Sequence, residues 1–360
     1  MKRFFPAPKY QVNIETTNHC CLNCFMCCNS IAKKRQGFIS LDVVRKSLDD
    51  FAKIFTPAED LLIQLIGQGE PLMHSKIFEI IQLVKGKGFK VDLVTNAVLL
   101  DEKKRKALIA SPLDELKLSF YGWDRDSYKE IHGKDRFDQA LENILMLLRE
   151  DRKFRISFHL LHCKTTEHLI KRLEELWSRF PVEIVVTYEA QNYRDILNKK
   201  NAQHDEEIKV PEGAIVFSQC CLNSPPIIHW DGSVSQCIYD YDSECPIGDI
   251  SRENYADILK GKAYQEFKKA MIEGKMEEAY GSVFCRICGY ADSMRLSNGE
   301  IVKLQRSRNR NSAVLGKGRD KDYLLKNFPL KSIKDWGQIF KELLLSMNPK
   351  TTGFSSRMNG

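Results

Sequence analysis

Five cysteines crowd into nine residues near the start of the chain, at Cys20, Cys21, Cys24, Cys27 and Cys28. Short spacings of this kind let one loop place three thiolates around a single cube of iron and sulfide. Two sets of three fit this geometry: Cys20, Cys24 and Cys27 with C-x3-C-x2-C spacing, or Cys21, Cys24 and Cys27 with C-x2-C-x2-C spacing. Neither set is followed by the further Cys-Pro of a ferredoxin run, so a cluster held here by three thiolates would keep one iron open.

Six further cysteines lie in the second half of the chain: Cys220, Cys221, Cys237, Cys245, Cys285 and Cys288. Cys285 and Cys288 form a C-x2-C pair, and Cys237 follows the dipeptide Asp231-Gly232, which predicts a hairpin turn. Four thiolates from this group could hold a second iron–sulfur cluster. The same four thiolates could instead hold a tetrahedral zinc ion.

The chain has 360 residues, 12 of them cysteine, a formal net charge of +7 and a mean hydropathy of −0.37. No apolar run approaches the ~18 residues that span a bilayer, and the N-terminal segment lacks the apolar region of a secretory signal. We therefore expect a cytoplasmic protein whose cysteines stay reduced and serve as ligands or catalytic groups. Metal-bound thiolates would offset part of the positive charge. No nucleic-acid-binding motif is recognised, so neither a membrane nor a nucleic acid is an expected partner.

Short apolar runs alternate with amphipathic helical segments through the first half of the chain. We expect helices at 41–55, 75–87, 102–110, 137–150 and 167–180, and strands at 11–16, 61–66, 89–95, 115–120, 155–162 and 182–187. This α/β alternation predicts a parallel sheet covered by helices, and six units favour a partial (β/α)6 barrel over the closed eight-unit form. In such a barrel, the loops after the carboxyl ends of the strands carry the chemistry.

The remaining sequence predicts a division into further parts. After a core at 1–190, residues 191–210 are polar and form an expected linker. Residues 211–293 hold the second group of cysteines and predict a small α+β domain with short strands and one helix at 255–273. In 294–360, a basic loop precedes an amphipathic helix at 333–347.

Further motifs follow the first cysteine group in order, three of them at the ends of expected strands. They are Gly67-Gln68-Gly69-Glu70-Pro71, Thr95-Asn96-Ala97, Ser119-Phe120-Tyr121-Gly122 and, a little later, Ile131-His132-Gly133. Together with the C-x3-C-x2-C spacing, these motifs resemble the radical S-adenosylmethionine (SAM) family over roughly residues 10–190. Two positions depart from the family pattern, because Met26 stands where an aromatic residue is usual and Tyr121 replaces an acidic residue.

The resemblance implies a 4Fe–4S cluster held by Cys20, Cys24 and Cys27, with SAM bound to its open iron. Reductive cleavage of SAM would give a 5′-deoxyadenosyl radical that takes a hydrogen atom from the substrate, and a flavodoxin- or ferredoxin-type protein would supply the electron. The residues expected to bind SAM are Gly67, Gly69, Glu70, Pro71, Thr95, Asn96 and Ser119. Asn96 could instead cap the helix that follows it.

The second cysteine group resembles the SPASM extension of this family. Met294 stands where the full pattern has another cysteine, so the resemblance is to the shortened twitch form with one auxiliary 4Fe–4S cluster. The resemblance implies four ligands for this cluster: Cys237, Cys285, Cys288 and either Cys220 or Cys221. A fully ligated second cluster suits electron transfer, which favours net oxidation of a substrate C–H, such as an alcohol carbon of an amino sugar. Epimerisation and modification of a peptide are alternatives, and an electron carrier or zinc-binding module without catalysis is a more distant one.

Two residues of the expected second domain have a chemical and a structural interpretation each. Cys245 would be a hydrogen-atom donor in an epimerase, or else a small buried residue. Asp240 would be a base, or else a solvated turn residue.

Overall fold

Six parallel strands form the centre of the molecule in a computed structural model that describes residues 10–55, 61–162, 166–188, 226–238, 240–273 and 313–314. Strands β1 to β6 pair with one another in sequence order. They span Tyr10–Ile14, Leu61–Leu65, Lys90–Thr95, Glu115–Leu118, Arg155–His162 and Glu183–Tyr188. The predicted α/β fold with a parallel, six-stranded partial barrel is therefore confirmed.

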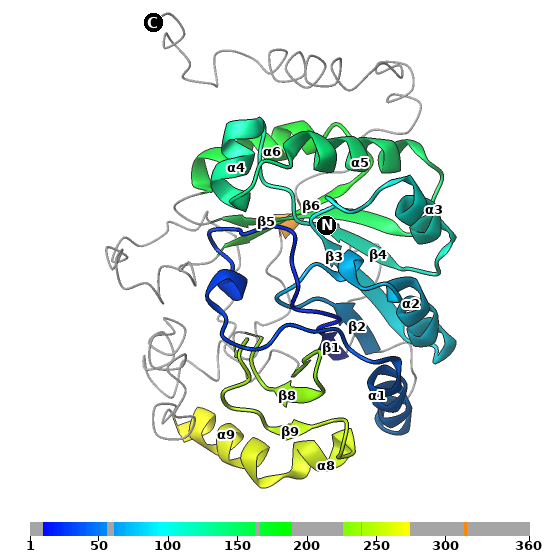
Figure 1. Ribbon diagram of the computed structural model, residues 1–360, viewed down its shortest axis with the longest axis vertical. Helices are drawn as coiled ribbons and strands as arrows, with labels where there is room; N and C mark the ends of the chain where they lie inside the picture. The colour runs from blue at the N-terminus through cyan, green and yellow to red at the C-terminus, as the bar shows by residue number, and fades with distance from the viewer. Residues whose placement is uncertain are drawn as a thin grey trace, which may run out of the picture.

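Helices connect the strands and form the outer layer seen along the right and top of Figure 1. Their bounds are α1 Leu41–Ile54, α2 Ile77–Gly86, α3 Glu102–Ala110, α4 Arg125–His132, α5 Phe137–Arg149 and α6 Glu167–Trp177, with short 3-10 turns η1 Cys28–Ile31 and η3 Pro71–Met73. Helices α1, α2, α5 and α6 each bury an apolar stripe, whereas α3 buries only Leu108. In α6, for example, Trp177 stacks on Phe158 of β5 with ring centroids 4.0 Å apart.

A second segment extends the sheet beyond its first strand. Strand β7 (Ile227–Ile228) pairs parallel with β1, and β8 (Ser233–Ser235) and β9 (Gly248–Asp249) follow as antiparallel neighbours. We name β7, β8 and the turn between them the auxiliary hairpin. Its turn contains Asp231-Gly232, and Gly232 has a φ of +91°, a conformation that favours glycine. The predicted hairpin turn is therefore present. On the opposite edge, β10 (Ala313–Val314) pairs antiparallel with β6.

Two local predictions were wrong. The single helix expected at 255–273 is two helices, α8 (Tyr255–Lys260) and α9 (Lys262–Glu273), which are separated at Gly261. Asn96 does not cap the third helix, because the side chain of Asp101 accepts the hydrogen bond from Lys104 N that caps α3. The Asn96 carboxamide oxygen instead accepts a bond from Val98 N at 3.0 Å, which closes a local turn after β3.

Helix α1 docks the second segment against the barrel through a buried carboxylate. Asp50 accepts a 3.2 Å hydrogen bond from the backbone N–H of Tyr255 at the start of α8. Burial alone would raise the pKa of Asp50, but the ammonium groups of Lys53 and Lys46 and the Tyr255 N–H hold it below its ordinary value. The ring of Tyr255 also meets Phe51 edge-on at 4.9 Å, so this contact combines polar and apolar packing.

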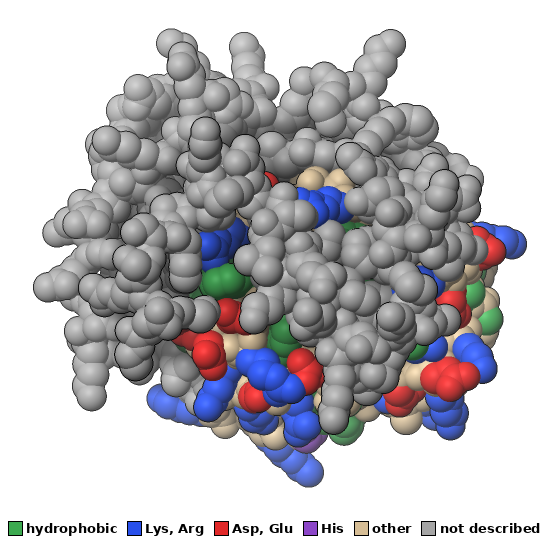
Figure 2. All heavy atoms as spheres, turned by 90° about the horizontal axis from the view of Figure 1, so that it is seen from above, with side chains coloured by type: hydrophobic (Ala, Val, Ile, Leu, Met, Phe, Trp, Pro, Cys, Tyr) green, Lys and Arg blue, Asp and Glu red, His purple; other side chains and the backbone are tan. Residues whose placement is uncertain are grey.

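The surface of the described residues mixes charges of both signs. On the face shown in Figure 2, Lys and Arg side chains lie beside Asp and Glu side chains along the lower edge. Among the described helices, none combines the length and the apolar character that crossing a membrane requires. The expected linker at 191–210 and the helix at 333–347 lie outside the described residues, as does the expected basic loop except for 313–314, which form β10.

Candidate functional site

Three loops meet at the carboxyl edge of the first strands. The cysteine loop (20–28) follows β1, the glycine loop (67–71) follows β2, and Thr95 and Asn96 stand at the end of β3. Glu70 N donates to the carbonyl oxygen of His19 at 2.7 Å, which joins the glycine loop to the residue before Cys20. The parallel order of the strands brings these motifs together, as the sequence analysis expects.

Glu70 ties two of the loops to each other. Its side chain is only 2% exposed and accepts hydrogen bonds from Thr95 Oγ1 at 2.7 Å, Asn96 N at 2.8 Å and Leu72 N at 3.0 Å. Burial raises the pKa of Glu70, while the hydrogen bonds from Asn96, Thr95 and Leu72 act in the opposite direction. An ionised carboxylate has about four acceptor positions, so these bonds account for three of them. Glu70 therefore holds the loops after β2 and β3 at a fixed separation.

The two glycines of the glycine loop are required by close contacts. A Cβ at Gly69 would lie 2.3 Å from the carbonyl oxygen of Thr17 and 2.5 Å from that of His19. A Cβ at Gly67 would lie 2.5 Å from the side chain of Glu15. Pro71 is buried and begins η3, where its missing N–H is no loss. The glycine loop therefore packs directly on the backbone that leads into the cysteine loop.

The neighbouring residues of β3 and β4 complete this edge. The carboxamide nitrogen of Asn96 lies 3.6 Å from Cys21 Sγ and 4.0 Å from Cys20 Sγ. Ser119, at the end of β4, donates its backbone N–H to the carbonyl oxygen of Thr95 at 2.9 Å. Of the residues that the sequence analysis expects to bind SAM, Gly69, Glu70 and Asn96 thus contact the cysteine loop or the residues that lead into it.

The end of α4 supports the cysteine loop from the other side. The carbonyl oxygens of His132 and Ile131 accept hydrogen bonds from Asn23 N and Phe25 N at 3.1 and 3.0 Å. Gly133 ends α4 in the left-handed region with a φ of +70°, and a Cβ there would lie 2.1 Å from the carbonyl oxygen of Asn23. The Ile131-His132-Gly133 motif therefore shapes the loop by backbone contact.

The imidazole of His132 faces a thiol of the cysteine loop. Its Nε2 accepts a 3.1 Å hydrogen bond from Tyr121 N, and its Nδ1 lies 3.2 Å from Cys24 Sγ. Burial lowers the pKa of His132 to about 3, so the ring is neutral and carries its proton on Nδ1. In this tautomer, the neutral ring can donate a hydrogen bond to the sulfur, as it would to a metal-bound thiolate.

The donor set of the cysteine loop fits an iron–sulfur cluster. Burial raises the pKa of Cys24, and the nearby thiolates of Cys27 and Cys21 raise it further. Sulfurs crowded in this way need a cationic group between them before they can ionise together. Across the described residues, no three His, Cys, Asp or Glu side chains are close enough to share one metal ion. A cube of four irons presents a separate iron to each thiolate, and three cysteines of this loop match that requirement.

The paired cysteines at each end of the loop have different surroundings. The thiol of Cys28 lies 2.8 Å from Gln68 Oε1, and its contact with Cys27 lowers the pKa of Cys27 against the opposing effect of burial. The Cys20 thiol likewise makes a hydrogen bond to Cys21, which raises the pKa of Cys20. Within each pair, the contact between the two sulfurs thus raises the pKa of one thiol and lowers that of the other.

The second cysteine group is described in part. Cys237 follows β8 and Cys245 lies eight residues later, both half-buried, whereas Cys220, Cys221, Cys285 and Cys288 lie outside the described residues. Asp240 is not a solvated turn residue, because it is 4% exposed and accepts hydrogen bonds from Ser235 Oγ, Glu244 N and Cys245 N. We name residues 237–245 the auxiliary loop. Within this loop, the Asp240 carboxylate holds the backbone at residues 244 and 245.

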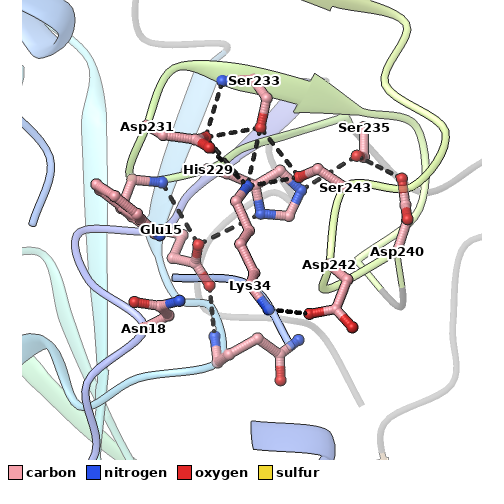
Figure 3. Close-up of polar contacts among 12 residues, drawn as sticks. Glu15, Asn18, Lys34, His229, Asp231, Ser233, Ser235, Asp240, Asp242 and Ser243 are labelled. Atoms are coloured by element: carbon pink, nitrogen blue, oxygen red, sulfur yellow. Dashed lines mark hydrogen bonds and ion pairs between the residues drawn. The ribbon is translucent and has the colours of Figure 1, made fainter. Parts of the chain in front are cut away.

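Contacts between the two halves of the site were not predicted. Lys34, which lies shortly after the cysteine loop, places its ammonium 3.0 Å from Asp231 Oδ2 and donates to Ser243 Oγ at 2.7 Å. The backbone N–H groups of Lys33 and Lys34 both donate to Asp242 Oδ1 at 2.8 Å. Figure 3 shows these contacts beside a second group formed by Glu15 and His229. No spacing rule relates residues about two hundred positions apart, so no signal in the sequence indicated them.

Comparisons with known proteins agree with this geometry. The model of the radical SAM superfamily matches residues 14–176, and the model of the SPASM iron–sulfur cluster-binding domain matches residues 220–289. An uncharacterised protein of Methanocaldococcus jannaschii is 32% identical over 139 residues, which are 38% of this chain and 43% of that protein. The chain therefore spans less than half the length of that relative.

Another relative covers more of the chain. The tungsten-containing aldehyde ferredoxin oxidoreductase cofactor-modifying protein of Pyrococcus furiosus is 23% identical over 299 residues, which are 71% of this chain and 82% of that protein.

Solved structures share the fold. Streptococcus suis SuiB bound to S-adenosylmethionine matches with a TM-score of 0.54 and 14% identity, over 73% of this chain and 68% of SuiB. The structure of anSMEcpe with bound AdoMet matches with a TM-score of 0.52 and 15% identity, over 83% of this chain and 98% of anSMEcpe. The chain belongs to the radical SAM superfamily with a SPASM-type iron–sulfur domain, and its cofactors are S-adenosylmethionine and two 4Fe–4S clusters.

Proposed function

We propose that this radical SAM enzyme oxidises a C–H bond of its substrate, an alcohol carbon of a small molecule such as an amino sugar, with the auxiliary cluster as electron acceptor. When bound, SAM and the first cluster supply a 5′-deoxyadenosyl radical that removes a hydrogen atom from the substrate. The observation that carries the proposal is the contact between the auxiliary loop and the glycine loop. There, Gln68 Nε2 donates to the carbonyl oxygen of Ile238, the residue after Cys237, at 3.3 Å.

The ligand assignment follows from the two cysteine groups. In this proposal, Cys20, Cys24 and Cys27 hold the first cluster and leave one iron for SAM. Cys237, Cys285 and Cys288, with Cys220 or Cys221, fill all four sites of the second. The proposed domains are the core at 1–190, a linker at 191–210, the auxiliary domain at 211–293 and a C-terminal part at 294–360. A flavodoxin- or ferredoxin-type protein is the proposed source of the electron that starts each turnover.

The residues of this chain position SAM and keep water out. Glu70 fixes the loops after β2 and β3, and Gly69 lets the glycine loop reach the backbone of the cysteine loop. His132 donates a hydrogen bond to Cys24 and so holds that sulfur in place. Because these groups are buried, they need to move little when SAM binds. A site that excludes water protects a reactive radical from side reactions.

Oxidation of an alcohol carbon balances with the two clusters. The C–H bond of the carbinol carbon breaks and its hydrogen atom ends on 5′-deoxyadenosine. When bound by Cys237, Cys285, Cys288 and Cys220 or Cys221, the second cluster would accept the electron that remains, while the hydroxyl proton is released to solvent and a carbonyl is left. A fully ligated cluster suits this task because it can change charge without binding substrate. The second cluster thus gives the reaction its net oxidation.

The products formed in heavy water test the proposed reaction class. Reconstituted protein, reduced with dithionite and given SAM, is incubated in D2O with a panel of amino sugars and short peptides, and the products are analysed by mass spectrometry. Oxidation predicts a product that lacks two hydrogens and carries no deuterium, in equal amounts from wild type and Cys245→Ala. An epimerised product with one deuterium, absent from Cys245→Ala, would contradict oxidation and identify Cys245 as the donor. A modified peptide would contradict the small-molecule assignment.

A further inference from the structure

A chain of buried polar side chains joins the auxiliary loop to the glycine loop. Ser235 Oγ donates to Asp240 Oδ2 at 2.7 Å, and His229 Nε2 lies 3.1 Å from Ser235 Oγ. On its other side, His229 Nδ1 lies 3.3 Å from Glu15 Oε2, and Glu15 Oε1 accepts the backbone N–H of Gln68 at 2.9 Å. Figure 3 shows the imidazole between the carboxylate of Glu15 and the hydroxyl of Ser235. Elements from both halves of the molecule contribute to this chain of contacts.

The hydrogen-bond pattern gives His229 two acceptors. The hydroxyl proton of Ser235 goes to Asp240, so its oxygen accepts from the imidazole, and the Glu15 carboxylate accepts from the other ring nitrogen. The side chain of His229 is fully buried, and that of Glu15 is 1% exposed. Without His229, the buried Glu15 carboxylate would keep only the backbone donors Gln68 N and Trp230 N, so the imidazole is its one side-chain donor among the described residues.

Glu15 in turn sets the backbone of the glycine loop. It follows β1 directly, and besides bonding Gln68 N it packs so closely on Gly67 that a Cβ there would lie 2.5 Å from its side chain. Any displacement of Glu15 therefore moves residues 67 and 68. Gly69 and Glu70 come next, and Glu70 is the residue that spaces the loops after β2 and β3.

The side chain of Gln68 is held from the same direction. Its Nε2 donates to the carbonyl oxygen of Ile238, and its Oε1 accepts from the thiol of Cys28. The second segment thus contacts Gln68 directly through Ile238, and indirectly through His229 and Glu15. Nothing in the SAM motifs themselves requires this, because the motif residues all lie before residue 134.

We propose that His229 is a positioning residue for SAM binding: by holding Glu15, it fixes Gln68 and places the glycine loop for SAM. This inference rests on the proposed SAM site at residues 67–71. The packing of the auxiliary hairpin on β1 and the affinity for SAM are therefore energetically coupled. Because His229 acts through Glu15 and Gln68 and contacts none of the proposed cluster ligands, its loss should change the affinity for SAM.

Matched substitutions at one position test the role of the ring nitrogen. His229→Asn places an amide nitrogen where Nδ1 was and keeps the bond to Glu15, whereas His229→Gln moves the amide to the place of Nε2 and His229→Ala removes both. The control is Asp50→Asn, which weakens the docking of α8 on α1 at a buried carboxylate away from the glycine loop. All four variants are prepared as reconstituted, cluster-loaded protein.

Two readouts separate positioning from general stability. We expect His229→Ala and His229→Gln to bind SAM about tenfold more weakly, the loss typical of a hydrogen bond to a charged group, with turnover at saturating SAM unchanged. Hydrogen exchange of the amides at 67–72 should become faster in these two variants. His229→Asn and Asp50→Asn should retain wild-type SAM affinity and slow exchange in this peptide.

Each other outcome counts against a defined part of the account. Wild-type protein that does not bind SAM would refute the proposed function itself. SAM affinity unchanged in His229→Ala and His229→Gln, with wild-type SAM binding intact, would overturn the positioning role alone. Equal losses in His229→Asn and His229→Ala would also overturn it, because the bond to Glu15 would then not be what matters. Should His229→Ala fail to fold, the comparison between Asn and Gln still decides the question.

Discussion

Replacing Cys20 or Cys27 with Ala should abolish cleavage of SAM and lower the iron content of reconstituted protein from about eight to about four atoms per chain. The physical reason is that a cluster held by three thiolates has no spare ligand, so loss of one sulfur leaves two irons open and the cube unstable. Iron and sulfide analysis, together with the yield of 5′-deoxyadenosine, measures both effects. The second cluster has its own four thiolates and should persist.

The chain supplies its own matched controls for this experiment. Cys21 and Cys28 are adjacent to Cys20 and Cys27 in the chain and, like them, form no disulfide. Cys21→Ala and Cys28→Ala should retain about eight irons and continue to cleave SAM. If Cys21→Ala loses the cluster while Cys20→Ala keeps it, the C-x2-C-x2-C set is the correct one, and the ligand assignment made here is wrong.

Gly69→Ala should weaken SAM binding by at least about a hundredfold, because displacement of a binding loop by about 1 Å can have an effect of this size. The added Cβ would lie 2.3 Å from the carbonyl oxygen of Thr17, a backbone atom that cannot rotate away. The glycine loop must therefore move off the cysteine loop, which also breaks the bond from Glu70 N to His19. Overpacking of this kind should destabilise the fold by about 2 kcal/mol. Equilibrium SAM binding and thermal unfolding measure the two effects.

Gly86→Ala is the control for the introduction of a methyl group. Gly86 is the last residue of α2, and a Cβ there meets nothing within 4 Å. This variant should bind SAM like wild type and gain up to about 1 kcal/mol of stability, since alanine favours a helix more than glycine does. Wild-type SAM affinity in Gly69→Ala would show that the glycine loop is not part of the SAM site.

Apolar periodicity was sufficient for the elements that bury a regular face. Strand β5 (Arg155–His162) has the bounds that the sequence predicts, and helix α5 (Phe137–Arg149) ends one residue before its predicted end. Helix α4 was not predicted, because among its eight residues only Tyr128 and Ile131 supply an apolar face. Its signals lie in its caps instead: a capping box of Asp124 and Ser127, and Gly133 in the left-handed region. A search for caps would have found it.

Part of the site, likewise, could be predicted from the sequence and part could not. The motifs after β1, β2 and β3 could be placed together from sequence, because parallel strands end at one edge. The contact between Glu15 and His229 could not, since it joins residues 214 positions apart and arises only when β7 pairs with β1. Asp240 is a parallel case, because its burial depends on Ser235 and on backbone N–H groups that no spacing rule connects to it.

The central claim is that the cysteine loop leaves one iron of its cluster open for SAM. Electron–nuclear double resonance on the reduced, reconstituted protein, with SAM carrying nitrogen-15 in its amino group, measures this directly. The account predicts that SAM changes the paramagnetic spectrum of the first cluster and that the labelled nitrogen couples to its iron. A spectrum that SAM leaves unaltered, with no coupling to the label, would mean that a side chain of the protein fills that position, and it would contradict the account.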